Sequence, residues 1–203
     1  MKRIVLTLTL TLLAGLQLAS AQERLSREDA LRYAKLAGAD TQQLKDTPIP
    51  TSVDLTQPVA MRDGEFGGMV LPQAKLSAET IAKTGEKPVA IGQLWLLGLT
   101  PMHNGEGVAE DKLRIATVKT PEGDEIKVPQ CALGVRRTAG GELELLVFGK
   151  DKEPLLKLAM KKIDAKQDAP LDMDAERSDE SGQITLKLLG QYEAKFKVTQ
   201  LER

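Results

Sequence analysis

The acidic stretch at residues 164–182 has residue types and a spacing that could bind a metal ion. It contains seven carboxylates against one lysine and one arginine, and its oxygens fall on alternate residues at Asp172, Asp174 and Glu176. Carboxylate oxygens are preferred ligands of Ca²⁺, although Arg177 stands where an EF-hand loop needs glycine and no flanking helices are predicted. The three residues are therefore candidate calcium ligands. The alternative is a solvated loop between two strands.

His103 is the single histidine, and it follows Met102 at the start of a polar, glycine-bearing loop predicted over residues 103–111. Thioether and imidazole ligands together suit copper, so His103 is a candidate copper ligand. A zinc site usually needs further histidine or cysteine ligands, and a catalytic triad needs a nucleophile brought to this loop by the fold. The alternative is an exposed histidine with no ligand role.

Other residues that could support catalysis are scarce. Cys131 is the single cysteine, and its apolar neighbours Ala132, Leu133 and Val135 favour a buried thiol over a reactive one. No serine lies in a nucleophile-elbow sequence, and no glycine-rich phosphate loop is present. The sequence indicates no catalytic residues and no required cofactor, and a hydrolase of unrecognised type is the third functional hypothesis.

The N-terminus has the pattern of a secretory signal peptide. Met1-Lys-Arg is followed by an apolar segment from Ile4 to Leu18 and then by Ala19-Ser-Ala21. A basic start, an apolar core and a small-x-small end predict cleavage after Ala21, with an uncleaved anchor as the alternative. No cysteine stands directly after the apolar segment, so a lipid attachment point is not indicated. We expect an exported protein, periplasmic or extracellular, without a membrane span after cleavage.

The composition of the exported part limits its partners. Loss of Lys2 and Arg3 lowers the 28 basic residues to 26, against 29 acidic residues. With no polybasic tract, nucleic acid and anionic membrane surfaces are not expected partners. Another exported or envelope protein is the expected kind of partner.

The longest apolar run after the N-terminus extends from Pro88 to Pro101 and predicts a central strand. Both of its faces are mostly apolar, as in a strand that is covered on both sides. The run is long for one strand, so we expect bends or bulges at Gly92 and Gly98 and a run that serves two sheets. Trp95 should then lie in the core between the sheets.

The remaining sequence alternates between apolar and polar residues, with turn signals about every ten residues. The last predicted hairpin places Ile184, Leu186 and Leu188 on the core side and turns at Gly190-Gln191 as a type II′ turn. Near the N-terminus, Ser26 should cap a short helix. That helix resembles the opening helix of PepSY propeptide domains, but the strands after it depart from that pattern and the family is not assigned.

These patterns predict a mainly β protein, an Ig-like or jelly-roll-like antiparallel β-sandwich of about eight to ten strands, with a β-barrel as the alternative. The expected organisation is a signal peptide at 1–21, a helix and extended connector at 22–50, and the β-sandwich domain at 51–203. The leading functional hypothesis is a non-enzymatic binding or envelope accessory module. The second is a protein that binds calcium or copper.

Overall fold

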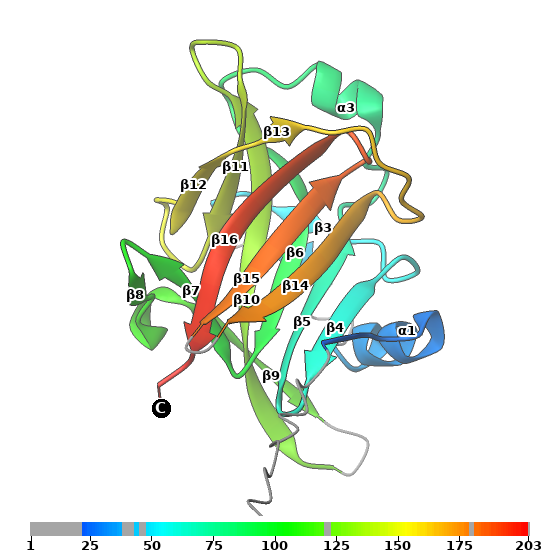
Figure 1. Ribbon diagram of the computed structural model, residues 1–203, viewed down its shortest axis with the longest axis vertical. Coiled ribbons are helices and arrows are strands. Elements are labelled where there is room, and N and C mark those ends of the chain that lie inside the picture. The colour runs from blue at the N-terminus through cyan, green and yellow to red at the C-terminus, as the bar shows by residue number, and fades with distance from the viewer. Residues whose placement is uncertain (1–21, 38–42, 45–47, 120–122, 179–180, 203) are drawn as a thin grey trace, which may run out of the picture.

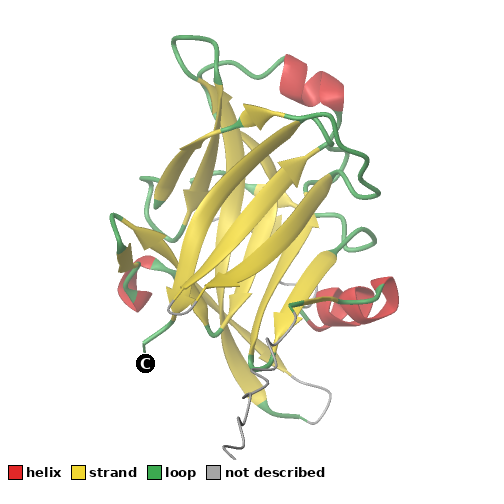
Figure 2. Cartoon of the chain, viewed as in Figure 1, coloured by secondary structure: helices red, strands yellow, loops and turns green. Residues whose placement is uncertain are grey.

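The computed structural model describes residues 22–37, 43–44, 48–119, 123–178 and 181–202, of which 43–44 are described in backbone only. The predicted signal peptide lies outside these residues. The described chain consists mainly of antiparallel strands in two sheets that pack face to face (Figures 1 and 2). The predicted antiparallel β-sandwich is therefore confirmed.

The first sheet contains eight strands. Its path runs in the order β1 (Glu23–Arg24), β4 (Val59–Asp63), β5 (Phe66–Pro72), β6 (Val89–Leu97), β10 (Glu125–Arg137), β11 (Leu143–Phe148) and β12 (Leu156–Ala159), and β9 (Arg114–Lys119) pairs beside β10. The predicted N-terminal segment thus contributes an edge strand to this sheet.

The second sheet contains six strands. Its path runs in the order β14 (Leu171–Ser178), β15 (Ser181–Leu188), β16 (Tyr192–Gln200), β7 (Leu99–His103) and β8 (Glu106–Gly107), and β13 (Lys161–Lys162) pairs beside β16. A separate two-stranded sheet joins β2 (Gln43–Leu44) to β3 (Thr51–Ser52).

The helices are short and lie outside the sandwich (Figure 2). Helix α1 (Arg27–Leu36) begins at Ser26, whose Oγ accepts the backbone N–H of Asp29 at 3.1 Å, so the predicted cap is confirmed. Helix α3 (Ala78–Ala82) and the 3₁₀ helix η1 (Glu110–Lys112) lie in connections between strands. No helix in the described ranges is long and apolar enough to span a bilayer.

The apolar run predicted to be central does serve both sheets. It forms β6 in the first sheet and β7 in the second, and the chain bends between them at Gly98, whose φ is +68°. That φ favours glycine, because a Cβ in this conformation meets its own backbone. The predicted division of the run at Gly98 is confirmed.

The predicted irregularity at Gly92 is confirmed as a β-bulge. Leu133 pairs with Gly92 while Gly134 pairs with Ala90, so Ile91 is the extra residue. A Cβ at Gly92 would lie 2.2 Å from the carbonyl oxygen of Leu71, so only glycine fits here. The bulge shifts the side-chain alternation, and Ile91 therefore joins the core between the sheets instead of sharing a face with Trp95.

The predicted position of Trp95 between the sheets is wrong, although the side chain is buried. Trp95 lies on the opposite face of the first sheet, in a second apolar cluster with Ala30 and Ala34 of α1. The reason is that the N-terminal segment covers this face, so the first sheet is buried on both sides. Trp95 Nε1–H donates to Oε1 of Gln93 at 3.2 Å.

Gln93 is fully buried and connects three parts of the chain. Its Oε1 also accepts from Nε2 of Gln130 on β10 at 3.0 Å, and its own Nε2 donates to Oγ1 of Thr51 on β3 at 2.8 Å. Buried amide groups must find partners, because an unpaired one loses its hydrogen bonds to water without replacement. Gln93 therefore fixes where the N-terminal segment crosses the sheet.

The C-terminal hairpin matches the predicted faces but not the predicted turn. Ile184, Leu186 and Leu188 face the core as expected. The backbone N–H of Gln191 donates to the carbonyl oxygen of Leu188, so the central residues are Leu189 and Gly190, with φ of +55° and +67°. Positive φ at both central residues is the type I′ pattern, so the predicted type II′ turn at Gly190-Gln191 is wrong by one residue.

Replacing Gln93 with leucine should lower the free energy of unfolding by about 2–4 kcal/mol, because Thr51, Trp95 and Gln130 all lose their buried partner. Urea denaturation followed by circular dichroism measures the change. The exposed Gln191→Leu is the matched control and should shift stability by less than about 0.5 kcal/mol. Equal shifts in both variants would contradict a structural role for the buried amide.

Cys131 is completely buried, and this burial raises the pKa of its thiol to about 12. The thiolate is the reactive form, so a thiol reagent should not modify the folded protein in the time that labels the urea-unfolded chain completely. Mass spectrometry counts the added groups. Rapid labelling of the folded protein would contradict the predicted buried thiol.

Candidate binding site at the edge of the second sheet

The three carboxylates predicted as calcium ligands lie on a strand and not in a loop. Residues 171–178 form β14, with Leu171 and Met173 buried in the core and Asp172, Asp174 and Glu176 on the other face. The expectation of a solvated connecting loop is therefore wrong for this part of the acidic stretch. The acidic composition favoured a loop in the prediction, but apolar residues that face the core alternate here with acidic residues that face outward, as in a strand.

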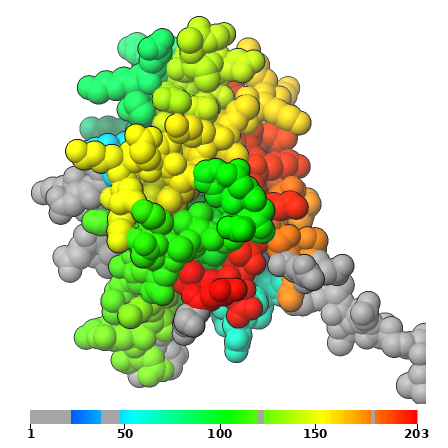
Figure 3. Space-filling view, turned by 90° about the vertical axis from the view of Figure 1, so that its left-hand side faces the viewer, coloured from blue at the N-terminus to red at the C-terminus, as the bar shows by residue number. Residues whose placement is uncertain are grey.

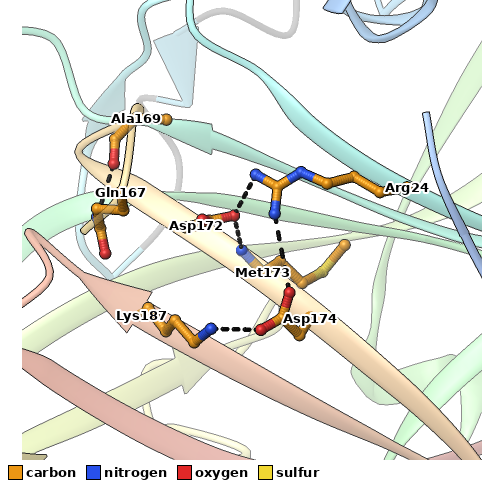
Figure 4. A network of polar contacts seen from close by, with 7 residues as sticks. All are labelled: Arg24, Gln167, Ala169, Asp172, Met173, Asp174 and Lys187. Atoms are coloured by element: carbon orange, nitrogen blue, oxygen red, sulfur yellow. Dashed lines mark hydrogen bonds and ion pairs between the residues drawn. The ribbon is translucent and has the colours of Figure 1, made fainter. Parts of the chain in front are cut away.

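The carboxylates of Asp172 and Asp174 form ion pairs with cationic side chains (Figure 4). Nη2 of Arg24 on β1 lies 2.7 Å from Oδ1 of Asp172, and Nη1 lies 3.8 Å from Oδ1 of Asp174. Lys187 on β15 donates to Asp174, and this hydrogen bond, with the nearby acidic charges, raises the pKa of Lys187. Two of the predicted calcium ligands thus belong to a network of ion pairs within the protein.

Glu176 and His103 lie apart from this network. Glu176 is exposed near the end of β14, and His103 is exposed at the end of β7, with β15 and β16 between the two strands. The structure therefore does not bring His103 to the acidic strand. Within the described residues, no group of three histidine, cysteine, aspartate or glutamate side chains is placed to hold a metal ion.

A second ion pair joins the two sheets further along β14. Nη1 of Arg177 on β14 lies 3.1 Å from Oδ2 of Asp63 on β4, just as Arg24 on β1 reaches Asp172 on β14. Both pairs connect β14 of the second sheet to the β1–β4 edge of the first. We call β14, β1 and β4 with these two ion pairs the clasped edge. The sequence did not indicate Arg24 or Arg177 as partners, because each lies more than a hundred residues from its carboxylate.

A cavity of about 240 Å³ opens between the sheets at the clasped edge. Two glycines bring the backbone close to side chains that line this cavity: a Cβ at Gly68 would lie 3.1 Å from Cε of Met173, and one at Gly182 would lie 3.0 Å from Cγ2 of Val198. The polar rim includes Arg62, Arg177 and Gln183. The apolar side chains of the lining are those of Met61, Phe66, Leu99, Met173, Ala175, Ile184 and Val198.

Gln22 also lines this cavity and contributes a buried acceptor. Its side-chain Oε1 is buried and has no hydrogen-bond partner among the described residues. Buried polar atoms nearly always have a partner, so an unsatisfied one marks a position where a further donor fits. The lining therefore combines apolar and polar side chains, and the Oε1 of Gln22 is an acceptor there without a partner among the described residues.

The main chain of β14 presents an open edge beside the cavity. In the described chain β14 pairs with β15 alone, and the backbone N–H of Met173 turns away from β15 to the carboxylate of Asp172 at 2.7 Å. In an antiparallel pair, the N–H groups of every second residue point the same way. The N–H groups of Ala175 and Arg177 therefore also point away from β15, and both residues line the cavity.

The opposite side of the sandwich is closed by direct packing. There η1 lies against the turn after β11, where the backbone N–H of Lys150 donates to the carbonyl oxygen of Lys112 at 3.2 Å (Figure 3). An ion pair of 3.3 Å between Lys112 and Asp151 adds to this contact. The two sides of the molecule therefore differ, because η1 covers this one while β14 leaves main-chain groups beside a cavity.

The chain was compared with protein-family models, curated proteins and solved structures, and none of the three comparisons found a match.

Replacing Arg24 with glutamine should lower the free energy of unfolding by about 1–2 kcal/mol, because the mostly buried Asp172 loses its cationic partner. Thermal and urea denaturation measure the loss. The matched control is Arg27→Gln, an exposed arginine three residues along the chain, which should change stability by less than about 0.5 kcal/mol. A smaller loss in the Arg24 variant than in the Arg27 variant would show that the ion pair does not hold the edge.

Proposed function

We propose that this protein is an exported, non-enzymatic binding module that captures an extended peptide segment of another exported or envelope protein at the clasped edge. The open main-chain edge of β14 at Ala175 and Arg177, directly beside an apolar cavity, is the observation that carries the proposal. Export is supported by the signal-peptide pattern that ends at Ala21.

Strand addition is the binding mode that suits this geometry. A peptide that pairs with a sheet edge gains affinity from main-chain hydrogen bonds and specificity from pockets for alternate side chains. Here the exposed edge supplies the N–H and C=O groups of residues 175–177, and the cavity supplies the pocket. The bound segment would extend the second sheet by one strand next to β14.

The size of the cavity favours a side chain over a small molecule. Its 240 Å³ lies below the roughly 300 Å³ at which pockets for drug-sized ligands begin. An apolar side chain from every second residue of an added strand would enter it. The buried Oε1 of Gln22 offers an acceptor for a donor on that side chain.

A fluorescent peptide of alternating valine and threonine tests the proposal. Valine would face the cavity and threonine the solvent, and fluorescence anisotropy should show saturable binding to the purified protein. The variant Ala175→Pro should weaken binding at least about tenfold, because proline removes an edge N–H while edge strands tolerate it.

The same peptide with N-methyl groups on alternate residues is the control for main-chain pairing. It retains the side chains but cannot donate to the edge, and it should bind much more weakly. Equal binding of the methylated and unmethylated peptides, or no binding of either, would contradict strand addition at β14. Circular dichroism of the Ala175 variant checks that it remains folded.

A further inference from the structure

We infer that the segment captured at the clasped edge is an amphipathic strand in which basic residues face solvent and apolar residues enter the cavity. This inference rests on the proposed function, and it names the chemistry of the partner. It follows from the charges on β14 and from the side chains that already neutralise some of them.

The outward residues of β14 are Asp172, Asp174 and Glu176, followed by Ser178, and the three carboxylates are not equally available. Asp172 is held by Arg24, and Asp174 is held by Lys187. Glu176 is exposed, and none of the ion pairs found in the described part of the chain involves it. Glu176 is therefore the carboxylate that an added strand would meet.

The position of Glu176 matches the open part of the edge. It lies between Ala175 and Arg177, the two residues whose N–H groups point outward beside the cavity. Side chains directly opposite on neighbouring strands lie about 5 Å apart, and opposite charges in such pairs stabilise the pairing. A lysine or arginine on the solvent face of the added strand would therefore pair with Glu176.

The same charges argue against a second copy of this chain as the occupant. Antiparallel pairing of two β14 strands about Ala175 would place Glu176 of one copy opposite Asp174 of the other. Like charges directly opposite each other destabilise strand pairing. Because three of the four outward residues of β14 are acidic, a basic strand pairs with this edge more favourably than a second copy of β14 does.

Two peptides that differ only in their outward residues test this inference. One alternates valine with lysine and the other alternates valine with glutamate, and both are measured by anisotropy at low ionic strength. The lysine peptide should bind the unchanged protein about threefold to fivefold more tightly for each charge pair formed. Raising the salt concentration should reduce this difference, because exposed charges are screened.

Reversing the charge of Glu176 tests whether this residue causes the preference for the lysine peptide. The variant Glu176→Lys should invert the order of the two peptides, whereas Glu142→Lys, at an exposed turn after β10, should leave it unchanged. Both variants alter the net charge equally, so general attraction cannot produce the difference. Since both side chains are exposed, each variant should fold as the unchanged protein does.

The outcomes separate this inference from the proposed function. If the valine–threonine peptide binds but the charged peptides bind equally, strand addition stands and the basic partner is overturned. If Glu142→Lys inverts the order as Glu176→Lys does, the assignment to the β14 edge is overturned. If no peptide binds, or if sedimentation equilibrium shows a dimer that Glu176→Lys strengthens, both conclusions fail.

Discussion

Burial of β6 on both faces is the constraint on which the rest of this structure depends. One face packs against the second sheet through Ile91, Leu94 and Leu96, and the other lies beneath the N-terminal segment through Trp95. A strand with two buried faces cannot tolerate unpaired polar groups, and the buried amide of Gln93 meets this requirement by bonding to β3, β10 and Trp95. The bulge at Gly92 sets which side chains reach each face.

The N-terminal segment that covers the outer face of the first sheet also forms part of the clasped edge. Before the N-terminal segment crosses the outer face, its first two described strand residues pair with β4 as β1 and extend the edge of the sheet. This brings Arg24 to the acidic strand β14, while Arg177 reaches back to Asp63. Two ion pairs thus connect the sheets at this edge, and the cavity lies between the sheets beside them. The candidate binding site is a consequence of how the outer face is buried.

The sequence drew attention to the acidic residues of β14 as candidate calcium ligands. Alternating carboxylates at Asp172, Asp174 and Glu176 are compatible with a calcium loop and with one face of a strand, and composition favoured the loop. The structure shows a strand, because residues 171–178 pair with β15, and Arg24 and Lys187 form ion pairs with Asp172 and Asp174. Arg24 lies 148 residues from Asp172, so no local pattern could have linked them. The cavity was likewise not predictable, since it is lined by both sheets and by Gln22.

Alternation of apolar and polar residues by itself determined the fold class, the core face of the C-terminal hairpin and the division of the central run at Gly98. These features are local, because side-chain alternation and the backbone freedom of glycine act over a few residues. Only the tertiary structure decided which sheet face Trp95 occupies, which cations hold β14 and where an open edge meets a cavity. Those features depend on contacts between segments far apart in the chain, and many pairings are compatible with the same local pattern.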